Sequence, residues 1–94
     1  METFDSFCKK HGFMDDPDYE KFSPVLAGEP EDSETLEETI VLGGVSIYIF
    51  DGLKVCEPAV ILDFETVEPM FMILSEFQEN EALYPQYKAA GGKF

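Results

Sequence analysis

The side chains best suited to nucleophilic or metal chemistry are few and widely spaced in this chain. His11 is the only histidine, and the two cysteines are Cys8 and Cys56. Cys8 and His11 share the spacing of one helix face, but a structural zinc site usually needs four Cys or His ligands in closer local pairs. No serine lies in the Gly-x-Ser-x-Gly context of a hydrolase nucleophile. We therefore expect no catalytic residues, no metal ion and no cofactor.

Carboxylates are abundant, but their spacing does not match a known acid–base or calcium site. Asp15, Asp16, Asp18 and Glu20 form a cluster that lacks the ligand spacing and the sixth-position glycine of an EF-hand loop. Asp63 is the acid in the most apolar context, between Leu62 and Phe64, and we expect it on the solvent face of a strand. An enzyme is accordingly the third of the three function classes that we consider.

The charge is large, negative and unevenly distributed. The chain of 94 residues carries a formal net charge of −14 at pH 7. Residues 15–38 hold ten acids and one lysine, and residues 57–81 hold seven acids and no base. Residues 39–56, between these two acidic blocks, are apolar and have no net charge.

This composition excludes two classes of partner. Proteins bind nucleic acid by neutralising phosphates with Lys and Arg, and this chain has six such residues, all lysines, among twenty acids. An anionic membrane surface would repel it for the same reason. We expect neither direct nucleic-acid binding nor membrane binding.

A strong negative field instead favours a basic protein as the partner, because opposite charges steer association. Carboxylates can take the places of phosphates in a groove that normally holds nucleic acid. In composition, the chain resembles small acidic phage inhibitors of host enzymes and immunity proteins that block nucleases. This resemblance implies an inhibitor of a nucleic-acid-binding enzyme or complex, of the anti-defence or nuclease-immunity type. The expected contacts are Asp15, Asp16, Asp18, Glu20, Glu31, Asp32, Glu34, Glu37 and Glu38, with Glu65 and Glu68 as a second patch.

The alternative is a structural or assembly subunit without enzymatic activity. It would use surplus aromatic residues and the run Met70, Phe71 and Met72 as an apolar interface, and it could form a homodimer. If the acids have no partner, they simply keep a small domain soluble.

The elements that would carry these side chains form one small α+β domain. Phe4, Phe7, Cys8 and His11 have the spacing of one helix face. Apolar runs begin at Thr39, Val45, Leu53 and Ala59. Asp51-Gly52 indicates a hairpin turn, and Gly43-Gly44 indicates either a second such turn or a β-bulge. We predict an N-terminal helix followed by an antiparallel β-meander of three to five strands.

Three segments outside this sheet are harder to assign. Residues 67–77 fit a helix and a buried strand equally well. Residues 28–38 indicate an acidic linker, and residues 89–94 indicate a flexible tail. No stretch has the length of a bilayer span or the pattern of a signal peptide, so we expect a cytoplasmic protein whose cysteines remain thiols.

Overall fold

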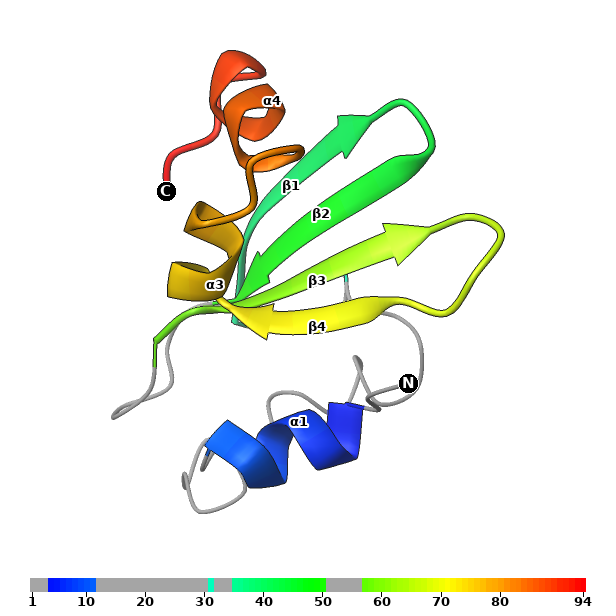
Figure 1. Cartoon of the computed structure of the whole chain (residues 1–94), viewed down its shortest axis with the longest axis vertical. Coiled ribbons are helices and arrows are strands. Elements are labelled where there is room, and N and C mark those ends of the chain that lie inside the picture. The colour runs from blue at the N-terminus through cyan, green and yellow to red at the C-terminus, as the bar shows by residue number, and fades with distance from the viewer. Residues whose placement is uncertain (1–3, 12–30, 32–34, 51–56) are drawn as a thin grey trace.

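The computed structural model describes residues 4–11, 31, 35–50 and 57–94, with the side chains of residues 4 and 5 left aside (Figure 1). Four strands form one antiparallel sheet in the order β1-β2-β3-β4, so neighbours in sequence are neighbours in the sheet. They are β1 (Leu36–Leu42), β2 (Val45–Phe50), β3 (Ala59–Phe64) and β4 (Met70–Ile73). The predicted α+β class and the meander are thereby confirmed.

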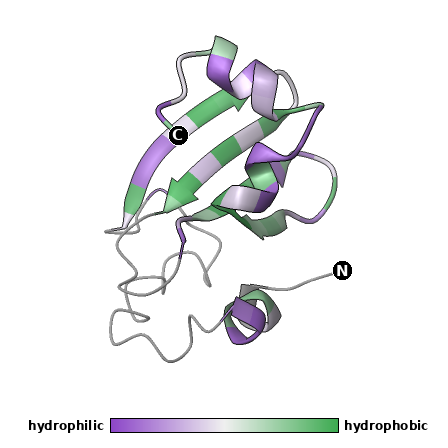
Figure 2. Ribbon diagram, turned by 60° about the vertical axis from the view of Figure 1, so that its left-hand side comes forward, coloured by the Kyte–Doolittle hydropathy of each residue, from purple (hydrophilic) through white to green (hydrophobic). Residues whose placement is uncertain are grey.

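Buried apolar side chains lie on both faces of the sheet, because helices pack against each face. Figure 2 shows hydrophobic residues alternating with paler, more polar ones along the strands. Helix α1 (Phe4–His11) packs on one face, where Phe7 and Cys8 contact a buried cluster with Phe50, Ala59 and Ile61. We call this the α1 face. The predicted helix is confirmed, and of the four residues of its predicted face, Phe7 and Cys8 are buried and His11 is half-buried.

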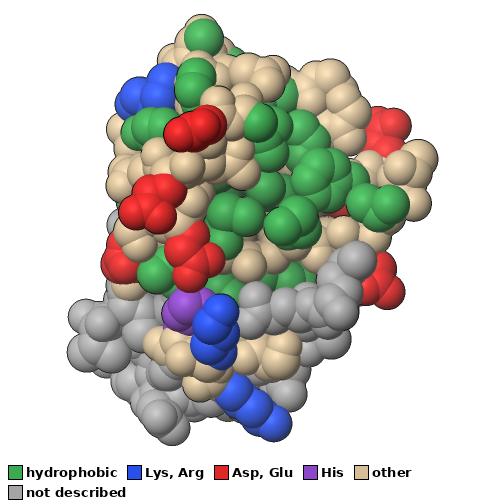
Figure 3. Space-filling model, in the orientation of Figure 1, with side chains coloured by type: hydrophobic (Ala, Val, Ile, Leu, Met, Phe, Trp, Pro, Cys, Tyr) green, Lys and Arg blue, Asp and Glu red, His purple; other side chains and the backbone are tan. Residues whose placement is uncertain are grey.

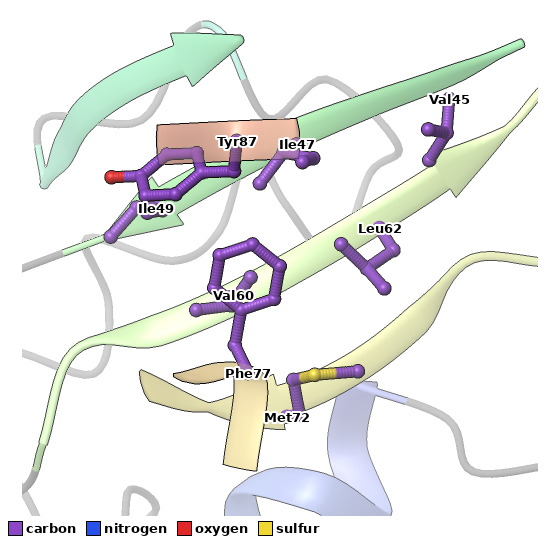
Figure 4. Packing of buried hydrophobic residues seen from close by; sticks show 8 residues of the cluster. All are labelled: Val45, Ile47, Ile49, Val60, Leu62, Met72, Phe77 and Tyr87. Atoms are coloured by element: carbon purple, nitrogen blue, oxygen red, sulfur yellow. The ribbon is translucent and has the colours of Figure 1, made fainter. Parts of the chain in front are cut away.

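The opposite face carries the larger part of the core, and we call it the C-terminal face. Helices α3 (Leu74–Gln78) and α4 (Tyr84–Ala89) pack against it. Figure 4 shows the rings of Phe77 and Tyr87 lying over Ile47, Ile49 and Val60. Phe77 meets Tyr87 edge to face, with ring centroids 5.2 Å apart, an arrangement that adds stabilisation beyond burial.

The first strand changes face in mid-course through a β-bulge. Leu36 pairs with Phe50 on the α1 face, whereas Glu38 pairs with Ile49 on the C-terminal face, so Glu37 is the extra residue. Ile40 therefore packs on the opposite side of the sheet from Leu36. β1 also begins three residues before the Thr39 start that we expected, and it includes the end of the predicted linker 28–38.

The turns match the sequence where they are described. Gly43 has φ +49° and Gly44 has no positive φ, so the two-residue turn between Leu42 and Val45 follows the type II′ pattern. The predicted Asp51-Gly52 turn and the run beginning at Leu53 lie outside the described residues. β2 still pairs antiparallel with β3 across that gap.

The ambiguity over residues 67–77 arises because both structures are present there. Met70 to Ile73 form the edge strand β4, and helix α3 begins at the next residue, Leu74. The Leu74 N–H donates to the Pro58 carbonyl oxygen at 2.9 Å, which holds this junction against the start of β3. Neither a single helix nor a single strand was the right assignment.

Helix α4 was not predicted, and the segment after it follows a defined path. Gly91 has φ +98°; its N–H donates to the Lys88 carbonyl, and that of Gly92 donates to the Tyr87 carbonyl. These two bonds make a Schellman C-cap, in which glycine takes the left-handed position. The glycine pair from which we expected a flexible tail thus ends α4 and turns the chain back towards the sheet.

Candidate protein-binding surface

Five of the eleven expected partner contacts can be located. Glu31, Glu37, Glu65 and Glu68 are exposed, and Glu38 is half-buried. The remaining six lie outside the described residues: Asp15, Asp16, Asp18, Glu20, Asp32 and Glu34.

Glu38 makes contacts within the chain. Its carboxylate accepts the Lys93 backbone N–H, at 3.0 Å on Oε2 and 3.3 Å on Oε1. Burial raises the pKa of Tyr87 to about 12, and a hydrogen bond to Glu38 contributes to the same shift. The Tyr87 hydroxyl in turn accepts the Phe94 N–H at 2.9 Å. Glu38 therefore fastens the end of the chain to β1.

The two acidic blocks meet the sheet at different places. Glu37 and Glu38 lie in β1, which forms one edge of the four-stranded sheet. Glu65 and Glu68 lie in the turn that joins β3 to β4, at the other side of the sheet. Neighbouring strands are about 4.8 Å apart, so roughly 14 Å separates β1 from β4. Glu37 and Glu38 therefore do not form one tight cluster with Glu65 and Glu68.

The second block contributes more exposed acids than the two that we selected. Glu57, Glu76, Glu79 and Glu81 are exposed as well. Glu57 Oε2 accepts the Ser75 hydroxyl at 3.1 Å, so the start of β3 and helix α3 present their acids close together. The signal was already in the sequence, because residues 57–81 contain no base; only the fold shows which of these acids are exposed.

Figure 3 shows how charge and apolar surface are distributed on one side of the molecule. Hydrophobic side chains gather over the sheet, with Asp and Glu on both sides of them, and Lys appears only towards α1 and α4. Among the residues with described side chains, the lysines are Lys9 and Lys10 of α1, Lys88 of α4, and Lys93.

The apolar run that we considered as an interface is divided by the alternation of β4. Met72 is buried among the core residues of the C-terminal face, and Phe71 packs half-buried in the cluster under α1. Met70 alone of the three is an exposed side chain, at 48%. Two of the three proposed interface residues thus belong to the core.

The side chains considered for other chemistry have ordinary surroundings. Cys8 is buried in the α1 cluster. Asp63 is half-buried beside Ser46 of the neighbouring strand and alternates with core residues, as expected for a strand's more polar face. The part of the chain that the structure describes contains no group of three or more His, Cys, Asp or Glu side chains placed to hold a metal ion. The other cysteine, Cys56, lies outside the described residues.

Within the same residues, every helix is too short or too polar to cross a lipid bilayer. Comparisons with protein-family models, with curated proteins and with solved structures find no match for this chain.

Proposed function

We propose that this protein is a small, non-enzymatic inhibitor that binds a basic, nucleic-acid-handling protein and occupies its basic groove with carboxylates. One observation supports this most strongly: between residues 57 and 81, six of the seven acids are exposed and no base accompanies them. Exposed carboxylates on a rigid sheet and helix scaffold are suitable acceptors for Lys and Arg side chains that otherwise bind phosphates.

The large excess of acids also favours steering of a basic partner. Lys9 and Lys10 are on α1, and Lys88 and Lys93 are near the end of the chain. The base-free segment 57–81 supplies the start and end of β3, the β3–β4 turn and α3. A field of one sign over such a surface raises the association rate with an oppositely charged partner at low salt. A cytoplasmic location, where nucleic-acid enzymes work, belongs to this proposal.

A second candidate function is an assembly subunit that associates through apolar side chains. It is favoured by two exposed large apolar residues close together in sequence, Val67 at 59% and Met70 at 48%. The net charge of −14 opposes direct self-association, because every copy carries the same excess of acids.

The test is affinity capture from the native host with two baits, the natural chain and a Glu65→Gln/Glu68→Gln/Glu79→Gln variant. We expect the natural chain to retain a protein with an isoelectric point above about 9, and to retain less of it as salt rises from about 50 to 300 mM. The triple variant should retain much less, and the purified natural chain should inhibit nucleic-acid binding by the captured protein. A partner that stays bound at high salt and binds both baits equally would refute the proposal.

A control variant also replaces charged side chains with glutamine, but it removes positive charge instead of negative charge. The Lys9→Gln/Lys10→Gln variant makes the chain more acidic and alters only α1. Capture by this variant should equal or exceed capture by the natural chain.

A further inference from the structure

The C-terminal face of the sheet is only partly covered by the helices. α3 and α4 lie over Ile49 and Val60. These two residues pair across β2 and β3, next to the Phe50–Ala59 pair at which β2 ends and β3 begins. The two rows at the opposite end are Leu42–Val45–Phe64 and Ile40–Ile47–Leu62–Met70. We define the turn-end patch by the incompletely buried members of these rows, which are Ile40, Leu42, Phe64 and Met70.

The members of the patch lie on one face of the sheet. Ile40 and Leu42 come from β1, Phe64 from β3 and Met70 from β4, and Val45, Ile47 and Leu62, which lie between them in the same rows, are buried beneath. Figure 3 shows this hydrophobic area open to the viewer, beside the helices.

Acids border the patch on two sides. Glu65 directly follows Phe64, and Glu68 precedes Met70 in the same turn. Across the face, α3 and the loop after it carry Glu76, Glu79 and Glu81. Figure 3 shows the same arrangement, with red side chains on both sides of the green area.

We propose that the turn-end patch is the docking core for the basic partner, and that its occupant is a partner segment in which apolar side chains alternate with or adjoin Lys or Arg. The inference rests on the proposed function and adds the apolar half of the recognition. The apolar side chains would cover Met70 and Phe64, while the basic ones reach Glu65 and Glu68. The charges give orientation and rate, and the buried apolar contact slows dissociation.

Charge complementarity selects this occupant over the other two that an apolar face could take. A second copy packed face to face would bring the acidic borders of both patches together, and like charges in an interface are unfavourable. A lipid surface with anionic headgroups meets the same repulsion. A basic, apolar protein segment satisfies both the patch and its border.

Two capped synthetic decapeptides, alternating Lys-Leu and alternating Lys-Ser, test the inference because they carry the same charge and differ only in apolar content. Each is titrated into the full ¹⁵N-labelled chain at 50 and 300 mM NaCl. We expect the Lys-Leu peptide to shift the amide signals of 39–42 and 62–70 and to bind at least about tenfold more tightly than Lys-Ser. Its binding should persist at 300 mM, whereas that of Lys-Ser should not.

Two serine variants locate the contact. Met70→Ser removes the most exposed patch member, and Val41→Ser removes a side chain that is 68% exposed on the opposite face of β1. We expect Met70→Ser to weaken Lys-Leu binding about tenfold, or about 1.4 kcal/mol, and to leave Lys-Ser binding unchanged. Val41→Ser should bind both peptides as the natural chain does. Unchanged far-ultraviolet circular dichroism shows that each variant is folded.

The outcomes separate the inference from the function on which it rests. If both peptides bind equally, or if the two variants behave alike, the docking core is wrong while the basic-partner proposal stands. If neither peptide binds, both fail. A dimer of the natural chain in sedimentation velocity that dissociates in Met70→Ser would instead assign the patch to a second copy and overturn the inference.

Discussion

Replacing Gly92 with alanine should destabilise the protein through a collision with one aromatic ring. A Cβ atom built on Gly92 would lie much closer to the Cζ and Cε1 atoms of Tyr87 than van der Waals contact allows. The ring is fully buried, and Phe77 packs against it edge to face, so it has little freedom to move away. Glycine is therefore needed at position 92 because a side chain there would collide with the Tyr87 ring.

The magnitude follows from the two ways in which the chain can relieve the collision. Displacing the buried ring is overpacking, which costs about 1–3 kcal/mol. Lifting the end of the chain instead breaks the hydrogen bonds from the Gly92, Lys93 and Phe94 N–H groups, each of which contributes about 1 kcal/mol. The two routes together predict a loss of about 1–3 kcal/mol in the free energy of unfolding.

Urea unfolding followed by circular dichroism measures this loss, and two other glycines serve as controls. Gly44→Ala adds a Cβ that meets nothing within 4 Å at a residue without positive φ, and it should change stability by less than about 0.5 kcal/mol. Gly91→Ala also has open space, but its φ of +98° should cost about 1–2 kcal/mol through backbone strain alone.

The chemical shift of a Gly92 α-proton tests the contact with the Tyr87 ring independently of overall stability. An α-proton of Gly92 facing the Tyr87 ring should resonate upfield of the usual glycine range in the natural chain, and it should return to that range in Tyr87→Leu. A Gly92→Ala variant as stable as Gly44→Ala, together with an unshifted Gly92 α-proton, would refute this packing.

Three further perturbations test the same half of the molecule. The phenol of Tyr87 loses its proton near pH 10 when unfolded and near pH 12 when folded, so the unfolded chain binds fewer protons in that window. Stability should then fall by about 2–3 kcal/mol as pH rises from 10 to 12, and urea unfolding of Tyr87→Phe should lack this fall. Asn80→Ala removes the Oδ1 that accepts the Ala82 and Leu83 N–H groups and should cost about 1 kcal/mol in urea unfolding, whereas Asn80→Asp, which keeps an acceptor, should cost less. Phe77→Leu loses edge-to-face contacts with two tyrosines and should cost about 1–3 kcal/mol, seen as a lower thermal midpoint; a midpoint within 1 °C of the natural chain's would contradict the packing.

Much of the sheet could be predicted because alternation and turn residues act locally. The Gly43-Gly44 pair fixes a two-residue turn, and apolar residues on both sides of β2 indicate a strand covered on both faces. The early start of β1 could not be predicted, since the bulge at Glu37 breaks the alternation. A bulge depends on which face each neighbouring residue must cover, and that is decided by tertiary packing.

Helix α4 was missed although its local signals are present. Pro85 lies in its first turn, and Gly91 is at the left-handed C-cap position. A six-residue helix is too short to show a clear apolar period, and the glycine pair alone is more typical of a tail. Its stability comes from burying Tyr87 on the sheet, which the sequence does not reveal.

The candidate surface was predictable in its charge and not in its apolar part. The count of acids and bases requires no fold, so residues 57–81 were identified as a base-free block directly. The three residues Met70 to Met72 are all apolar, so their sequence does not indicate which side chains face outwards. The sequence also does not show that the strand ends at Ile73 and that α3 begins at Leu74. Only the paired strand shows that Met70 is exposed and Met72 is buried.

The segment 65–70 carries two acids, Glu65 and Glu68, and the exposed apolar side chain of Met70. It can therefore make charge contacts and an apolar contact, and these respond differently to salt. Exposed charge pairs are screened over about 8 Å at physiological ionic strength, whereas a buried apolar contact is nearly insensitive to added salt. A purely phosphate-like surface would lose nearly all affinity by 300 mM salt, and a purely apolar one would lose none. The arrangement in this chain predicts an intermediate behaviour, in which salt mainly slows association and Met70→Ser mainly speeds dissociation. Measuring the two rate constants separately, in natural chain and variant, therefore distinguishes this surface from either simpler one.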